Sequence, residues 1–183
     1  AYCPGGRFNT TGDAESPDTQ LATYTYDDLV MTFEQTLYTP YMLKTDMELR
    51  QSDMIPYWPQ NATRIEIFGS EAMMFMGRHG GGYEVYERPQ SRQPVCTRRV
   101  YGRFPDPEHK ENFLQCMRDR KRPNADIEKG HRSTLLCHFA TISYRLGGRV
   151  LKINTEDGTL IDCPEGEKFY RRQYRTPYVI EEV

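Results

Sequence analysis

One stretch, residues 126–147, constrains the fold more than any other part of the chain. Asp126 is a residue type that caps the first N–H groups of a helix, and Gly147 can adopt the positive φ that ends one. Between these ends, apolar residues recur at the three- and four-residue spacing of one helical face: Leu135, Leu136, Phe139, Ile142 and Leu146. A stripe this wide is typical of a helix buried against a sheet. We therefore predict a long, partly buried helix here.

The residues before this helix alternate as strands do. Residues 20–26 and 29–35 flank a tight acidic turn and predict an antiparallel hairpin. In the first of these strands, Tyr24 and Tyr26 share one face. Further strands are predicted over residues 6–10, 63–69, 71–77, 82–86 and 96–103, and after the helix over residues 149–153. Residues 38–60 show no sustained period and predict a long excursion.

A second helix is predicted to begin near residue 106. Asp106 is a good N-cap, and Pro107 suits the first helical position. The basic residues 120–122 lie near the negative end of that helix, so helix capping explains them without a nucleic acid. The aromatic and basic tail, residues 169–180, is typical of a segment that straps across its own domain.

The order of these elements predicts an α+β fold, an open, mainly antiparallel β-sheet with helices on one face. The 183 residues fit a single domain. The other face of the sheet is expected to be partly apolar, with Tyr24, Tyr26, Phe68, Met73, Met74 and Met76. A sheet covered on one side only needs a partner for an apolar second face. We therefore expect a homo-oligomer that forms through this open face.

Charge and cysteine content exclude several classes of protein. The net charge of −2 argues against a nucleic-acid-binding surface. The five cysteines are odd in number and form no CxxC pair, which suits neither a disulfide framework nor a zinc site and favours a reducing compartment. No apolar run is long enough to cross a membrane. We expect a cytoplasmic protein, or a periplasmic one if an export signal precedes this sequence. Because the sequence opens without Met, we expect further residues upstream.

Four residues are candidates for contact with a small polar ligand. Arg78 and His79 adjoin a run of glycines, which permits close approach between backbone and ligand, although a flexible hairpin turn explains the run equally well. Asp18 and Thr19 end a polar loop before a strand, and their side chains suit hydrogen bonds to the hydroxyl groups of a ligand. We expect all four to lie at one end of the sheet.

The histidines are weaker candidates. His131 and His138 share a face of the predicted long helix, but the sequence has no HExxH and no Cys or carboxylate set at ligand spacing. We favour two histidines hydrogen-bonded at the edge of the core over a metal pair. A metal-dependent hydrolase that used His79, His109, His131 and His138 would rest on histidines alone. We predict no catalytic, cofactor-binding or metal-ligating residue in this chain.

Two long segments carry a resemblance to a known family. Residues 105–126 read PDPEHKENFLQCMRDRKRPNAD, and residues 130–147 read GHRSTLLCHFATISYRLG. Both closely resemble the C-terminal domain of Gfo/Idh/MocA-type oxidoreductases, in the branch common in Bacteroidetes and Planctomycetes. Residues 16–20, 64–69, 76–82 and 174–178 agree with it, so the resemblance covers nearly the whole chain.

The resemblance implies a two-domain enzyme that transfers a hydride between NAD or NADP and a sugar or polyol. In that family an N-terminal Rossmann domain binds the dinucleotide and ends in a Glu-Lys-Pro motif with a catalytic lysine. The C-terminal domain opens with an Asp-x-x-x-His helix, lines the substrate site and packs subunits together. This sequence has none of the three motifs, GxGxxG included, so no hydride-transfer residue carries over.

We therefore interpret residues 1–183 as a single C-terminal substrate and oligomerisation domain, without a Rossmann domain and inactive alone. The implied partners are its own N-terminal Rossmann domain, a second copy of the chain and a sugar-like small molecule. The alternative is a free-standing ligand-binding or scaffold module without catalysis. The coding sequence upstream distinguishes the two, because a strand followed by GxGxxG there supports the enzyme.

Overall fold

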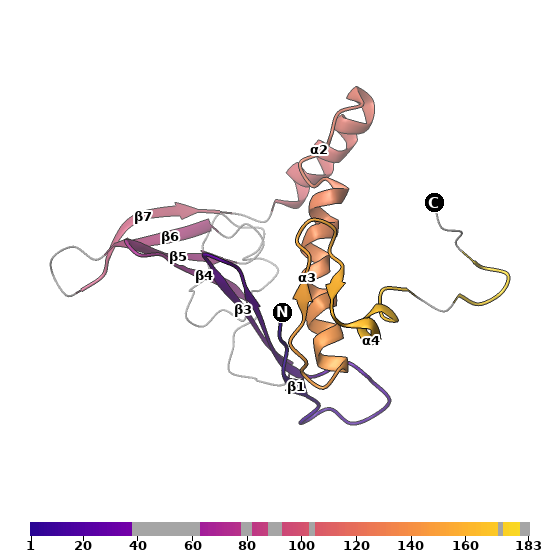
Figure 1. The fold of residues 1–183 in the computed structure, drawn as a ribbon. Helices are drawn as coiled ribbons and strands as arrows, with labels where there is room; N and C mark the ends of the chain where they lie inside the picture. Colours follow the sequence, from indigo (N-terminus) through magenta and orange to yellow (C-terminus); the bar gives the residue numbers. More distant parts are fainter. Residues whose placement is uncertain (38–62, 78–81, 88–92, 103–104, 172–173, 180–183) are drawn as a thin grey trace. The chain divides into compact units, whose positions relative to one another are not determined.

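The computed structural model describes residues 1–37, 63–77, 82–87, 93–102, 105–171 and 174–179 (Figure 1). The predicted excursion over residues 38–60 lies outside these ranges. The chain divides into two compact units. One joins Ala1–Tyr38 to Asp126–Val183, and the other is Thr39–Ala125. The first unit is therefore built from two separate stretches of sequence.

The long helix of the first unit is α3, Ile127–Arg145. Its N-cap is Asp126, whose side chain accepts a hydrogen bond from the backbone N–H of Glu128 at 3.0 Å. Gly147 and Gly148 follow the helix with φ of 73° and 79°, a conformation that glycine adopts without steric cost. The helix predicted over residues 126–147 is confirmed.

A three-stranded antiparallel sheet packs against α3, with the order β1-β2-β3. Its strands are β1, Gly5–Gly6; β2, Thr19–Thr25; and β3, Val30–Thr36. The predicted hairpin is thus confirmed. The strand predicted over residues 6–10 is shorter than expected, because the N–H groups of residues 8–10 turn toward Asp18 and leave the ladder.

The core of this unit lies between β2 and α3. Ala22 and Tyr24 are buried, and they belong to one cluster with Phe139, Ala140 and Ile142 of the helix. The Tyr24 hydroxyl donates to the carbonyl of Leu136 at 2.6 Å. Burial, aided by nearby ionisable groups, raises the pKa of Tyr24 to about 12. The expectation that Tyr24 lies on an open face is wrong, because this side of the strand faces the helix.

Ser143 joins three parts of the chain at the centre of the first unit. Its side chain is fully buried, and its Oγ accepts a hydrogen bond from the backbone N–H of Cys3 at 2.9 Å. The same hydroxyl donates to the carbonyl of Arg149 at 2.7 Å. Leu151 donates its N–H to the carbonyl of Ala1 at 2.7 Å, which continues the same attachment. A single buried hydroxyl therefore connects the first residues, the helix and the segment after it.

Short elements complete this unit. They are β8, Lys152–Ile153; β9, Leu160–Ile161; and the one-turn helix α4, Pro164–Glu167 (Figure 1). The strand predicted over residues 149–153 contains β8, whereas β9 and α4 were not predicted because elements of two to four residues carry no periodic signal. The tail begins against this unit, since the Tyr170 hydroxyl donates to the carbonyl of Gly158 at 2.7 Å.

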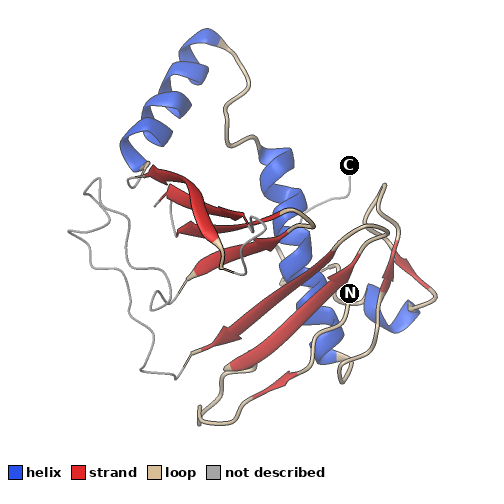
Figure 2. Ribbon diagram, turned by 90° about the vertical axis from the view of Figure 1, so that its left-hand side faces the viewer, coloured by secondary structure: helices blue, strands red, loops and turns tan. Residues whose placement is uncertain are grey.

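The second unit contains a four-stranded antiparallel sheet with the order β4-β5-β6-β7. These strands are labelled in Figure 1 and, like all the strands, are red in Figure 2. The strands are β4, Arg64–Phe68; β5, Ala72–Gly77; β6, Gly82–Glu87; and β7, Val95–Tyr101. The α2 helix, Asp106–Asp119, follows. Its N-cap is Pro105, so the prediction of Asp106 as the cap is wrong by one position. Asp106 is already helical, and its carboxylate lies 3.8 Å from the ammonium of Lys110.

The two faces of β4–β7 differ in chemistry. Cross-strand pairing and alternation of side chains define a charged face: Arg64, Glu66, Phe68, Met73, Phe75, Glu84, Tyr86, Arg99 and Tyr101. The opposite face, called the apolar face, is mainly apolar and carries Ile65, Ile67, Met74, Met76, Tyr83, Val85, Arg98 and Val100. The expectation that Phe68 and all three methionines share a face is wrong, because adjacent strand residues point to opposite sides. Among the described residues of these four strands, none is buried on either face.

The architecture is α+β with mainly antiparallel sheets, as predicted. The described strands form separate sheets of three, four and two strands. Of the helices in the described ranges, none has the length and apolar character needed to cross a membrane.

Replacing Ser143 with Ala tests the central attachment. The variant leaves the N–H of Cys3 and the carbonyl of Arg149 without their buried partner. Because an unsatisfied buried group costs about 1–3 kcal/mol, we expect the free energy of unfolding in urea to fall by roughly 2–4 kcal/mol. Ser133→Ala is the matched control, since Ser133 is exposed and its hydroxyl bonds only the carbonyl of Lys129 in the same helix. Equal effects of the two substitutions would contradict the role of Ser143 as the buried link between α3, Cys3 and Arg149.

Candidate functional site

Asp18 lies at the base of the loop between β1 and β2. Its carboxylate accepts hydrogen bonds from the backbone N–H groups of Phe8, Asn9 and Thr10, the last two at 2.8 Å. The residue is 1% exposed. Asp18 therefore occupies an arrangement of convergent N–H groups that suits an anion.

These hydrogen bonds set the protonation state of Asp18. Burial alone raises the pKa of a carboxyl group, but here the N–H donors of Asn9, Phe8 and Thr10 outweigh burial and hold the pKa of Asp18 well below its usual value. The side chain is consequently a carboxylate at any physiological pH. Its contacts in the structure are with its own loop, and its predicted role toward a ligand stays a prediction.

Of the other predicted ligand residues, the structure describes Thr19 but not Arg78 or His79. Thr19 begins β2, and its hydroxyl lies 3.4 Å from that of Thr36 on the neighbouring strand. Arg78 and His79 lie outside the described residues, so their position relative to Asp18 and Thr19 stays a prediction.

The histidines of the helices are solvent-exposed. His109 of α2 and both His131 and His138 of α3 are exposed, so the interpretation of the α3 pair as histidines at the core edge is wrong for these side chains. The buried stripe of α3 runs instead through Phe139, Ala140, Ile142 and Ser143. Within the described ranges, no group of three or more His, Cys, Asp or Glu side chains could hold a metal ion.

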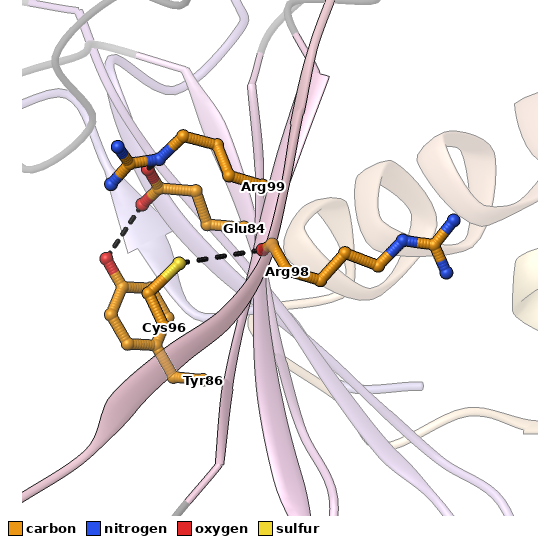
Figure 3. A network of polar contacts seen from close by, with 5 residues as sticks. All are labelled: Glu84, Tyr86, Cys96, Arg98 and Arg99. Carbon is orange, nitrogen blue, oxygen red and sulfur yellow. Dashed lines mark hydrogen bonds and ion pairs between the residues drawn. The ribbon is translucent and has the colours of Figure 1, made fainter.

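A polar network that the sequence did not reveal lies on the charged face of β4–β7. Arg99 Nε contacts Glu84 Oε1 at 2.5 Å, and the Tyr86 hydroxyl donates to Glu84 Oε2 at 2.8 Å (Figure 3). This hydrogen bond, together with burial, raises the pKa of Tyr86. The ring of Tyr86 also meets that of Phe75 edge-to-face, with centroids 5.8 Å apart. Both oxygens of the Glu84 carboxylate are thereby fixed.

A β-bulge lies beside this network. The register shifts between Val85 and Tyr86, so Tyr86 pairs with Cys96 while Glu84 pairs with Arg99. Cys96 and Arg99 are three positions apart, and an uninterrupted strand would place them on opposite faces. In Figure 3 both lie on the side of Glu84 and Tyr86, whereas Arg98 points the other way. Only the alternation of Glu84 and Tyr86 was readable in the sequence, because a bulge leaves no periodic signal there.

This arrangement has the chemistry to bind a polar ligand. Arginine and tyrosine are hydrogen-bond donors, and the aromatic rings offer flat apolar surface. Arg98 lies over the ring of Tyr83 at 5.5 Å on the opposite face, so the two neighbouring arginines have separate environments. The network therefore indicates a binding surface.

Replacing Asp18 with Asn tests its structural role. We expect lower stability at neutral pH, because a neutral amide is a weaker acceptor for three N–H donors. A depressed folded-state pKa contributes stability above the unfolded pKa of about 4, and this contribution is lost as pH falls below it. Urea unfolding from pH 7 to pH 2.5 should therefore show wild type and variant converging in acid. Asp13→Asn, at an exposed position in the same loop, should stay close to wild type throughout.

Comparison with known proteins identifies the family. Residues 53–180 match the model of the oxidoreductase family, C-terminal alpha/beta domain, named for Gfo/Idh/MocA. Comparison with curated proteins and with solved structures gave no match. The matched residues include β4–β7 with the Glu84 network and all of α2 and α3. Because the match spans well over half of the sequence, the chain belongs to the Gfo/Idh/MocA oxidoreductase family, in its C-terminal α/β domain.

Proposed function

We propose that this chain is the substrate-binding and oligomerisation domain of a cytoplasmic NAD(P)-dependent oxidoreductase that acts on a sugar or polyol. The observation that carries the proposal is the family match over residues 53–180. The Glu84 network supports it, because a fixed array of donors, acceptors and aromatic rings suits a hydroxylated ligand. The activity of the full-length protein, measured as NAD(P)H formed with a panel of sugars and polyols, tests the proposal. Absence of any NAD(P)-linked turnover would contradict it.

The described residues do not suit a dinucleotide. Pyrophosphate binds where a glycine-rich turn opens a helix and presents free N–H groups. Here α2 carries Asp106 and Glu108 in its first turn, and α3 is capped by Asp126 with Glu128 next to it. These acidic side chains repel a second anion at both helix ends. The cofactor in our proposal is therefore bound by a separate Rossmann domain, and the chain is inactive without it.

Self-association is proposed through the apolar face of β4–β7. Ile65 and Ile67 are 55% and 48% exposed on the edge strand, and the methionines Met74 and Met76 continue the same face. A contiguous apolar sheet surface of this kind is costly in water. A symmetric dimer covers it with an identical surface.

A second candidate, a ligand-binding or scaffold module without catalysis, uses the same surfaces. It differs in requiring no nucleotide-binding domain in the same polypeptide. The coding sequence upstream of Ala1 decides between them, because only the enzyme needs a strand followed by GxGxxG.

We expect the 183-residue chain to show no binding of NAD(H) or NADP(H) in titration calorimetry. The reason is the acidic character of both helix N-termini and the lack of a phosphate-cradling turn. The full-length protein is the positive control. Micromolar affinity for either dinucleotide in the isolated chain would contradict the proposal that a separate Rossmann domain binds the cofactor.

Ile67→Glu should shift the chain from dimer to monomer in light scattering across a concentration series. The substitution places a charge on the apolar face, where dimerisation would bury it unpaired. Phe68→Glu is the matched control, since Phe68 is the adjacent residue, is 70% exposed and lies on the charged face. A wild-type chain that stays monomeric at high concentration would rule out the interface.

A further inference from the structure

The charged face of β4–β7 has two neighbouring positions without side chains at one end. Gly77 ends β5 and pairs with Arg64, and Gly82 begins β6 and pairs with Tyr101. Because β5 and β6 are adjacent, these glycines leave a stretch of backbone uncovered by side chains of their own, between the positions of Arg64 and Tyr101. Gly82 has φ of 84°, which other residues rarely adopt. Glycine within strands marks places where a ligand can approach the backbone closely.

The next cross-strand row supplies polar and aromatic groups. It runs from Glu66 through Phe75 and Glu84 to Arg99. Glu84 is only 15% exposed at its side chain, and its two oxygens are engaged by Arg99 and Tyr86. Glu84 therefore acts as a fixed anchor for its neighbours and as neutralising charge beside Arg99.

The anchor orients the guanidinium of Arg99. Its Nε faces Glu84 (Figure 3), and Tyr101 is a further side-chain hydrogen-bond partner of the same guanidinium. The two Nη atoms form the outer edge of the group, and the side chain is 48% exposed, so a ligand can reach that edge beside Tyr101. A guanidinium held in one orientation presents parallel donors at the geometry of a carboxylate. Among small carbohydrates, this chemistry selects those that carry an acid group.

We propose that the charged face of β4–β7 binds a sugar acid, a hydroxylated ring that bears a carboxylate. The carboxylate pairs with the outer edge of Arg99, and the ring lies over the backbone at Gly77 and Gly82 beside Phe75. This inference rests on the proposed function and narrows its substrate class from sugars in general to sugar acids.

The test measures binding of glucuronate and glucose to the 183-residue chain by NMR titration. We expect glucuronate to bind at least about tenfold more tightly than glucose, since a charge-assisted bidentate pair contributes that much. Arg99→Gln should remove this preference. Arg98→Gln is the matched control, because Arg98 is the adjacent arginine on the opposite face, over the ring of Tyr83. It should leave both affinities unchanged.

Arg99→Lys is a control for misfolding of the Arg99→Gln variant. It keeps the positive charge and removes only the planar guanidinium with its paired donors. Its glucuronate affinity should fall several-fold while its thermal unfolding midpoint stays near wild type. Equal binding of glucose and glucuronate, or equal effects at positions 98 and 99, would overturn the inference. If the wild-type chain ignores glucuronate while the full-length protein oxidises neutral sugars, the inference fails and the proposed function stands. If the wild-type chain does not bind glucuronate and the full-length protein oxidises no sugar or polyol, both fail.

Discussion

The contact between α3 and β2 is the interaction on which the first unit depends. The helix buries Phe139, Ala140 and Ile142 against the side of β2 that carries Ala22 and Tyr24. Burying one large apolar side chain contributes roughly 1.5–3 kcal/mol, so a handful of residues supplies most of the driving force for this unit. The hydroxyls of Tyr24 and Ser143 within that contact each donate to a backbone carbonyl. Apolar burial and hydrogen bonding therefore favour the same arrangement.

The second unit is organised on another principle. Its four strands are joined by an antiparallel ladder with one bulge, and none of their described residues is buried. Hydrogen bonding of the backbone gives this sheet its shape, while its side chains form two chemically distinct faces. The charged face holds a network fixed by Glu84, and the apolar face holds Ile65 and Ile67. A surface with this division suits one small-molecule ligand and one protein partner.

Much of the fold was readable in the sequence, and the reason is periodicity. The α3 helix and the hairpin β2–β3 have long apolar patterns with clear end signals, and both were predicted within a few residues. The side of the hairpin that faces the helix was assigned wrongly, because alternation tells which residues share a face and not what covers it. The faces of Met73, Met74 and Met76 were also assigned wrongly. Neighbouring apolar residues show no alternation with polar ones, so the pattern does not tell which face each of them occupies.

The candidate site was less predictable, because it depends on features without a local pattern. Asp18 was singled out as a polar residue before a strand, but its three N–H partners arise from a loop conformation that no spacing encodes. Arg99 meets Glu84 through the register of the β6–β7 pairing, which no spacing in the sequence encodes. The family resemblance supplied the general role of the chain, while the residues of the charged face emerged from cross-strand register alone.

The division of the first unit into two stretches of sequence has a consequence for the order of folding. Cys3 and Ser143 must meet across all of Thr39–Ala125, the whole of the second unit. Closing a flexible loop of that length costs roughly 4 kcal/mol of chain entropy, and the cost falls when the intervening residues have already become compact. Compaction of the inserted residues shortens the effective loop and so lowers the entropic cost of forming the Cys3–Ser143 hydrogen bond. Early formation of the local ladder in the second unit would therefore favour closure of the first.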